Sequence, residues 1–311
     1  MPETPNRPKI VILCGPTGIG KTSVAIECAS AIGGEIISAD SMQVYRRMDI
    51  GTAKPTPAET ARVPHHLIDV ADPDEPFDAA RFVTLARPAV DRLVRAGKPV
   101  FVVGGTGLYI KALTEGLFPA PAASPEVRER LRRIAEAEGA EAIHRRLADR
   151  DPETAARLHV NDTFRVLRAL EVFETTGRPI SALHRDHDFS DRPYQTLKIA
   201  LFTDREALYD RIDRRVDAMI AAGLLDEVSG LLAMGYGADL KPMQSLGYRQ
   251  MVAYLDGELT WDEAVRTMKR DTRRYAKRQL TWFRADSEMV WHRPDEIDEI
   301  RCRVEGFLDA G

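Results

Sequence analysis

The sequence Gly15-Pro16-Thr17-Gly18-Ile19-Gly20-Lys21-Thr22 decides the fold of this chain, because it fits the phosphate-binding pattern G-x-x-x-x-G-K-[ST] at every fixed position. The preceding run KIVILC, at positions 9–14, is continuously apolar, which is typical of a buried parallel strand. Residues 21–32 then carry apolar side chains at helical spacing. The stretch therefore predicts a strand, a phosphate-binding loop and a helix, in the order that the motif requires.

The chemistry of this loop follows from its fixed residues. Glycines allow backbone N–H groups to surround phosphate oxygens, and Lys21 adds a positive charge. The Thr22 hydroxyl, at the amino end of the helix, is placed to ligate Mg²⁺. We therefore expect the whole loop to bind a chain of phosphates. The motif does not say which phosphate compound is bound, and a small-molecule kinase would fit it equally well.

Composition limits the class of protein. The chain has 311 residues, of which 44% are hydrophobic, enough for one large domain or two ordinary ones. No apolar run approaches the roughly 20 residues of a membrane helix, and the amino end has no apolar signal region, so we expect a cytoplasmic protein without a membrane segment. The spacing of Cys14, Cys28 and Cys302 predicts neither a disulfide framework nor a zinc ribbon.

The rest of the chain alternates between strand and helix patterns. Buried-strand patterns recur at 35–38, 99–103, 197–202 and 289–292, and helices are expected over 205–232 and 260–284, among others. This alternation predicts an α/β fold, a P-loop NTPase-like doubly wound parallel sheet. Residues 126–187 follow a Pro-rich linker and are charged and helical, so we expect an inserted helical subdomain. The expected domains are a catalytic core, 1–122 and 193–311, and an insertion, 123–192.

Two polar residues are expected beside the phosphate loop. Asp40 follows the second strand and Thr106 follows the third, and loops that leave the carboxyl ends of parallel strands share one edge of the sheet. A carboxylate in that place can hold Mg²⁺ or accept a proton from a nucleophile. Asp is also a residue that shapes turns, and this second interpretation stays open.

The helix expected over 260–284 is basic although the whole chain has a net charge of −4. Residues 261–284 contain eight Lys or Arg against three Asp or Glu. Arg266, Arg270, Arg273 and Lys277 fall on one face, and a mostly apolar side that includes Tyr275, Gln279 and Trp282 lies opposite. The basic face predicts contact with nucleic acid, against the alternative of a solvated charged surface.

The segment ISADSMQVYRRMDIGTAKP, at 37–55, closely resembles the signature of the tRNA dimethylallyltransferase family, also called isopentenyl-tRNA transferases. The likeness covers nearly the whole chain. Further matches are VPHHLID at 63–69, GGTGLYIK at 104–111, DPETAAR at 151–157, Asn161, Asp162, Arg165, RALE at 168–171, LGYRQ at 246–250, TRRYAKRQ at 272–279 and TWFR at 281–284. The carboxyl-terminal part has only Cys302 and no zinc-finger pattern, so the resemblance is to the bacterial type.

This resemblance implies transfer of a dimethylallyl group from dimethylallyl diphosphate to the exocyclic N6 amine of the adenine directly 3′ of the anticodon. The implied partners are the donor and the anticodon stem-loop of tRNA; the implied cofactor is Mg²⁺, and we expect a monomer. Asp40 is expected to accept the proton of the amine, and Thr106 and Lys21 are the other expected catalytic residues.

The resemblance also implies which residues bind the donor and which bind tRNA. Donor binding is expected from Gly15, Pro16, Thr17, Gly18, Ile19, Gly20, Lys21, Thr22, Arg211 and Arg215. The two arginines lie one helical turn apart and also fit an ordinary charged helix face. Contacts to tRNA are expected from Asp40, Ser41, Met42, Gln43, Thr106, Arg128, Phe164, Arg165, Arg168, Gln244, Ser245, Leu246, Gly247, Tyr248, Arg249, Arg273, Lys277, Arg278 and Gln279.

Three rival functions fit part of this pattern. A small-molecule P-loop kinase fits the loop and the sheet. A prenyltransferase that acts on free adenine nucleotides fits the same site, but the basic helix favours a macromolecular acceptor. A tRNA-binding protein without activity would not need Lys21, Thr22, Asp40 and Thr106 together.

Overall fold

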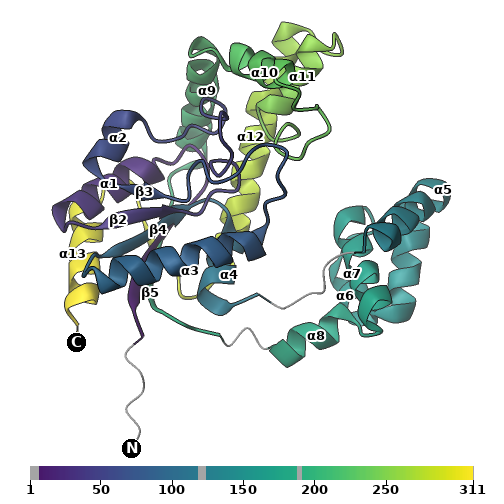
Figure 1. The fold of residues 1–311 in the computed structure, drawn as a ribbon, viewed down its shortest axis with the longest axis horizontal. Helices are drawn as coiled ribbons and strands as arrows, with labels where there is room; N and C mark the ends of the chain where they lie inside the picture. The colour runs from purple at the N-terminus through teal and green to yellow at the C-terminus, as the bar shows by residue number, and fades with distance from the viewer. Residues whose placement is uncertain (1–6, 118–123, 188–190, 311) are drawn as a thin grey trace, which may run out of the picture. The chain divides into compact units, whose positions relative to one another are not determined.

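A computed structural model describes residues 7–117, 124–187 and 191–310. Within these residues lies a parallel sheet of six strands in the order β3-β2-β4-β1-β5-β6 (Figure 1). The strands are β1 (Lys9–Cys14), β2 (Glu35–Ser38), β3 (His65–His66), β4 (Val100–Gly104), β5 (Gln195–Leu201) and β6 (Val290–His292). The chain extends the sheet first on one side of β1 and later on the other, which confirms the expected doubly wound fold.

Strand β1 lies at the centre of the sheet. Val11 pairs with Phe101 of β4 on one side and with Leu197 of β5 on the other. Residues 10–14 are buried, because helices cover both faces of a central parallel strand, and this explains its continuous apolar sequence. All the strands run parallel, so the loops that follow β1, β2 and β4 leave the same edge of the sheet.

Helices cover the two faces of the sheet (Figure 1). The core unit comprises Met1–Thr114 and Pro193–Gly311. Its helices are α1 (Lys21–Ala31), α2 (Pro57–Arg62), α3 (Ala79–Arg95), α4 (Gly107–Glu115), α9 (Arg205–Ala221), α10 (Leu224–Ala233), α11 (Tyr248–Leu255), α12 (Trp261–Arg284) and α13 (Ile297–Asp309). On one face, α1, α9 and α13 share a buried apolar cluster with the strands. On the other, α3 packs on β2 and β4, and its Phe82 stacks on Tyr109 of α4 with ring centroids 4.6 Å apart.

The expectation of a single helix over 205–232 is wrong, since the structure has two helices there. Gly223 separates α9 from α10 with a φ of 95°, a left-handed conformation that glycine adopts without steric cost. Apolar residues continue at helical spacing on both sides of this glycine, so periodicity alone did not reveal the break. Helix α12 begins as expected, after Thr260, which forms a capping box with Glu263.

The second compact unit spans Glu115–Arg192. Its helices are α5 (Pro125–Arg150), α6 (Pro152–Arg157), α7 (Thr163–Thr176) and α8 (Ile180–His187), and its described residues contain no strand. They enclose a separate apolar cluster that includes Leu131, Ile143 and Val166. The unit begins before residue 123, where the insertion was expected to start, and residues 118–123 of the expected linker lie outside the described part of the chain.

None of the helices in the described ranges is both long and apolar enough to cross a membrane.

Candidate active site

The phosphate loop connects β1 to α1, and its shape depends on glycine. Gly15, Gly18 and Gly20 have φ values of 148°, 80° and 98°. A Cβ atom on Gly18 would lie 2.9 Å from Cγ1 of Ile212, and one on Gly15 would lie 2.9 Å from the carbonyl oxygen of Leu201. The loop is thus packed against α9 and the end of β5, and only glycine fits these positions.

Lys21 turns back over the loop that precedes it. Its Nζ atom donates hydrogen bonds to the carbonyl oxygens of Gly15, at 3.1 Å, and Pro16, at 2.9 Å. Burial lowers the pKa of Lys21 to about 8, and the nearby Arg215 cation acts in the same direction, while Asp40 opposes the shift. A bound anion would therefore be attracted to a cation that has little water around it.

The Thr22 hydroxyl lies in the first turn of α1. It makes no hydrogen bond to any described residue, and the first backbone N–H groups of a helix have no partner within the helix. An unpaired hydroxyl beside unpaired N–H groups is suited to a magnesium-bound phosphate group.

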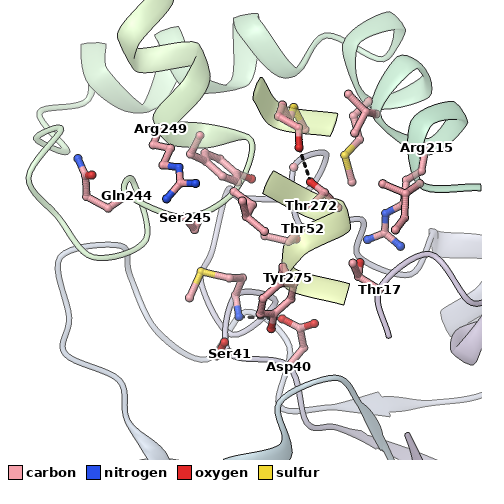
Figure 2. Close-up of a pocket in the computed structure, with 18 of the residues that line it drawn as sticks. Thr17, Asp40, Ser41, Thr52, Arg215, Gln244, Ser245, Arg249, Thr272 and Tyr275 are labelled. Atoms are coloured by element: carbon pink, nitrogen blue, oxygen red, sulfur yellow. Dashed lines mark hydrogen bonds between the residues drawn. The ribbon is translucent and has the colours of Figure 1, made fainter. Parts of the chain in front are cut away.

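Two arginines of α9 face the loop region in different ways. Nη1 of Arg211 donates to the carbonyl oxygen of Ile19 at 3.1 Å, so this side chain supports the loop itself. Arg215 lines the pocket near Thr17 (Figure 2) and has no hydrogen-bond or ion-pair partner among the described residues. Burial lowers its pKa, and the charge of Asp40 opposes that shift. Arg215 is the better placed of the two to meet an anion.

The loops after β2 and β4 are tied together at Asp40 and Thr106. Oδ1 of Asp40 accepts backbone hydrogen bonds from Met42, at 2.8 Å, and Gln43, at 3.3 Å. Oγ1 of Thr106 accepts from the Ser41 N–H at 3.0 Å, and the Thr106 N–H donates to Ala39 at 3.2 Å. One carboxylate oxygen thus shapes the turn, and no described residue donates to the other, Oδ2. The turn-forming interpretation is correct for Oδ1 and leaves Oδ2 available for chemistry.

These elements surround a pocket of about 290 Å³ in the core unit (Figure 2). Thr17, Asp40, Ser41 and Arg215 contribute polar groups to its lining. The apolar part of the lining includes Met42, Ile212, Val216, Met219, Leu246 and Met268. The pocket therefore offers an anion-binding region, a carboxylate and an apolar wall within one space.

Tyr275 of α12 is a lining residue that sequence patterns assigned only to the packed side of the helix. Its ring lies beside Asp40 in Figure 2. Burial and the negative charge of Asp40 raise the pKa of Tyr275 to about 12. Its hydroxyl therefore keeps its proton at neutral pH beside the carboxylate.

The segment before α11 and the first turn of that helix form another part of the wall. Gln244, Ser245, Leu246, Tyr248 and Arg249 all line the pocket. Tyr248 is fully buried and donates to Oε1 of Glu227 at 2.6 Å, while Nη2 of Arg249 lies 2.7 Å from Oδ2 of Asp271. Gly247 donates its N–H to the Gln250 side chain at 2.9 Å.

Glu227 of α10 organises this wall, and sequence reasoning missed it. Its carboxylate accepts from the backbone N–H groups of Asp49, Ile50 and Gly51 at 2.8, 2.8 and 3.1 Å. The ring of Tyr248 occupies the space where a Cβ on Gly51 would lie. Nothing in the local sequence distinguishes Glu227 from a surface carboxylate of an amphipathic helix, so only the tertiary structure identifies it.

Gln43 and Gln279, both expected to contact tRNA, use their amides inside the protein. Gln43 accepts from the Ser38 hydroxyl at 3.0 Å and donates to the Ala53 carbonyl at 3.1 Å. Gln279 bridges the phosphate loop and the loop after β4.

The basic face of α12 is partly neutralised by carboxylates. Arg273 lies 3.5 Å from Asp213 and over the ring of Tyr209, and Arg270 pairs with Asp271 at 3.0 Å. Lys277 and Arg278 are exposed. Trp282 was expected on the packed side, but 44% of its surface is exposed although its indole also contacts Gly107.

In the second unit, two of the expected RNA-contact residues pair with one buried carboxylate. Glu171, 3% exposed, pairs with Arg128 at 3.2 Å and with Arg168 at 2.9 Å. Arg165 pairs with Asp162, the N-cap of α7, and Phe164 has 83% of its surface exposed. The pairing holds the guanidinium groups in place, and the exposed ring offers a surface for stacking.

Comparisons with known proteins show the family of this chain. The model of the family described as IPP transferase matches residues 43–286. The chain is 60% identical, over 95% of its length and 86% of the relative's, to a tRNA dimethylallyltransferase of Syntrophobacter fumaroxidans. It is 55% identical to the corresponding protein of Desulfosudis oleivorans, over 99% of this chain and 98% of that relative.

Solved structures show the same likeness. A tRNA isopentenylpyrophosphate transferase of Bacillus halodurans has 42% identity and a TM-score of 0.73, with 97% of each chain covered. A eukaryotic dimethylallyltransferase that acts on tRNA has 31% identity and a TM-score of 0.75, over 88% of this chain and 69% of that one. Because the family model spans most of the chain and these relatives match along nearly all of it, the chain belongs to the IPP transferase family.

Proposed function

We propose that this chain transfers a dimethylallyl group from dimethylallyl diphosphate to the exocyclic N6 amine of the adenine 3′-adjacent to the anticodon of tRNA. Family membership makes the chain a tRNA-modifying transferase. The donor, the reacting atom and the roles of individual residues are our proposal. One observation carries it: Thr17 of the phosphate loop, the Asp40 carboxylate and an apolar wall line a single pocket.

The phosphate loop would hold the leaving group. As the allylic C–O bond breaks, positive charge develops on carbon and negative charge on diphosphate, so fixed donors on the diphosphate lower the barrier. The loop N–H groups, Lys21 and Arg215 are suited to this role. The apolar lining from Ile212, Val216 and Met219 would exclude water from the allylic cation.

Asp40 would act on the other reactant. When the adenine nitrogen forms its bond to the allylic carbon it must lose a proton, and Oδ2 of Asp40 is the carboxylate oxygen that no described residue occupies. Thr106 holds the backbone next to Asp40 through Ser41, and so fixes the direction of the carboxylate. The proton ends on Asp40, and diphosphate leaves with the electron pair of the broken bond.

Mg²⁺ fits the oxygen donors of the loop. The free Thr22 hydroxyl would be its protein ligand, together with oxygens of the diphosphate. The bound ion would supply further neutralisation of charge on the leaving group.

The acceptor would enter from the side of α12 and the segment before α11. An adenine in an anticodon loop must leave its stack to reach Asp40, so cations are needed on the backbone around it. Residues we propose for this contact are Ser41, Met42, Gln244, Ser245, Arg249, Arg273, Lys277 and Arg278 in the core unit and Arg128, Phe164, Arg165 and Arg168 in the insertion. We further propose that the enzyme acts as a monomer in the cytoplasm, where tRNA is found.

Labelled substrates test this function. The chain is incubated with dimethylallyl diphosphate carrying label in the prenyl group, with an anticodon stem-loop, with free AMP, or with neither. We expect label in the stem-loop alone. Label in AMP would favour a nucleotide prenyltransferase, and transfer of phosphate from labelled ATP without prenylation would favour a kinase.

A further inference from the structure

Gln279 joins two loops that are distant in sequence. It lies on α12 with 7% of its surface exposed. Its Oε1 accepts from the Thr17 N–H in the phosphate loop at 2.9 Å, and its Nε2 donates to the Gly105 carbonyl after β4 at 2.9 Å. Both ends of the amide are therefore occupied within the protein.

The orientation of this amide is fixed by chemistry. The Thr17 N–H is a donor and the Gly105 carbonyl is an acceptor. Rotating the amide by half a turn would place its NH₂ group against the Thr17 N–H and its oxygen against the Gly105 carbonyl, and neither pair can form a hydrogen bond. A Cβ on Gly105 would overlap Nε2 of Gln279, so the side chain fits tightly against the loop. Neither a shorter side chain nor an apolar one of equal length can replace both contacts.

The phosphate loop is consequently held between two helices. Ile212 of α9 contacts Gly18, Arg211 donates to the Ile19 carbonyl, and Gln279 of α12 accepts from Thr17. Loss of the Gln279 amide would leave the N–H group of the half-buried Thr17 and the buried Gly105 carbonyl without these partners. The loop would then lose this contact with α12 and keep its contacts with α9 and the end of β5.

We propose that Gln279 is a positioning residue for the diphosphate site and makes no contact with RNA. This inference rests on the proposed function, because it takes diphosphate as the ligand of the loop. Its neighbours Lys277 and Arg278 are exposed on the same turn of α12. The same turn of α12 therefore has two roles. Its inward residue, Gln279, positions the phosphate loop, and its outward residues, Lys277 and Arg278, face the acceptor.

A matched pair of substitutions tests this separation. Gln279→Met keeps the length of the side chain and removes both hydrogen bonds, and Lys277→Met makes the same replacement on the exposed side. Donor KM and kcat are measured at saturating stem-loop, and the stem-loop Kd is measured by fluorescence anisotropy. For Gln279→Met we expect donor KM to rise about 10-fold, the cost of roughly one buried hydrogen bond, with stem-loop Kd within twofold of the unsubstituted chain. For Lys277→Met we expect the reverse pattern.

A rise in stem-loop Kd for Gln279→Met, with donor KM unchanged, would overturn the proposal. If that variant does not fold, Gln279→Asn gives the same test, since its amide is one methylene too short to reach both partners. Hydrogen exchange of the Thr17 amide supplies a readout independent of turnover, and it should become faster in either variant.

Failure of the proposed function is recognised separately. If the unsubstituted chain binds inorganic diphosphate with Mg²⁺ but transfers no prenyl group, the proposed reaction is wrong. The Gln279 assignment is then judged on diphosphate affinity by calorimetry and on Thr17 exchange. Unchanged values in both measurements would refute it.

Discussion

The donor side and the acceptor side of this protein are built differently. The phosphate loop is held by backbone geometry, with three glycines at positive φ and side chains of α9 and α12 packed on it. The surfaces proposed for RNA consist of exposed and half-buried side chains, and several of their arginines already pair with carboxylates, such as Arg249 with Asp271. A preorganised site loses much when one group is removed, whereas a surface of many paired cations loses little from each.

The largest effect is expected at the point where the two sides meet. Asp40→Ala should lower single-turnover prenyl transfer by about 1,000-fold, because general-base catalysis is lost. Stem-loop affinity should change little, because the proposed contacts to the stem-loop are distributed over many side chains, each of which contributes little. Substantial remaining turnover would show that another group accepts the proton.

The next effect concerns the charge of Lys21. The pKa of its amine is lowered to about 8 in the ligand-free protein, so the cation is present at pH 7 and is lost as pH rises through 8. Donor KM should therefore rise about 5-fold between pH 8 and pH 9, because the charged fraction of the amine falls from about one half to about one tenth. Lys21→Arg, which stays charged, should bind donor more weakly but show no such rise. An equal rise in that variant would assign the titration to another group.

A smaller effect is expected from the wall between the two sides. Glu227→Gln replaces a carboxylate that accepts three backbone hydrogen bonds with an amide that places N–H groups against them. Urea denaturation should show a loss of about 2–3 kcal/mol in the free energy of unfolding. Tyr248→Phe, which removes only the hydroxyl contact, should cost about 1 kcal/mol. Equal losses in the two variants would mean that the backbone contacts contribute nothing.

The smallest effect is expected on the exposed RNA surface. Arg165→Ala removes one cation that pairs with Asp162 in solvent, so the free energy of unfolding should change by less than about 1 kcal/mol. Stem-loop affinity should fall a few-fold, and the slope of log affinity against log salt should decrease by about 0.7, the share of one phosphate contact on single-stranded nucleic acid. An unchanged slope would exclude Arg165 from contact with a phosphate.

Much of the donor side could be predicted from the sequence. The motif at 15–22 specified a strand, a loop and a helix, and the apolar runs specified the order of strand patterns. Local periodicity failed at Gly223, where the apolar pattern continues across a helix break. It also failed at Trp282, because a helical pattern says which residues share a side but not how far the neighbouring elements cover it.

The acceptor side was less predictable for the same reason. Gln43 and Gln279 are polar residues in matching family segments, and nothing in their sequence neighbourhood shows that their amides bond to the protein's own loops. Tyr275 was expected to pack against the domain, yet its ring also lines the pocket beside Asp40.

The sequence by itself determined the phosphate loop, the parallel α/β fold and the family resemblance, because these depend on short patterns whose backbone geometry is local. The tertiary structure decided which polar groups are occupied and which are free. It paired Oδ1 of Asp40 with a turn, left Oδ2 without a donor among the described residues, and turned Gln279 inward to the loop. The position of Gln279 depends on hydrogen bonds between residues more than 170 positions apart, as in its contact with Gly105, and residues so distant in sequence give no local signal.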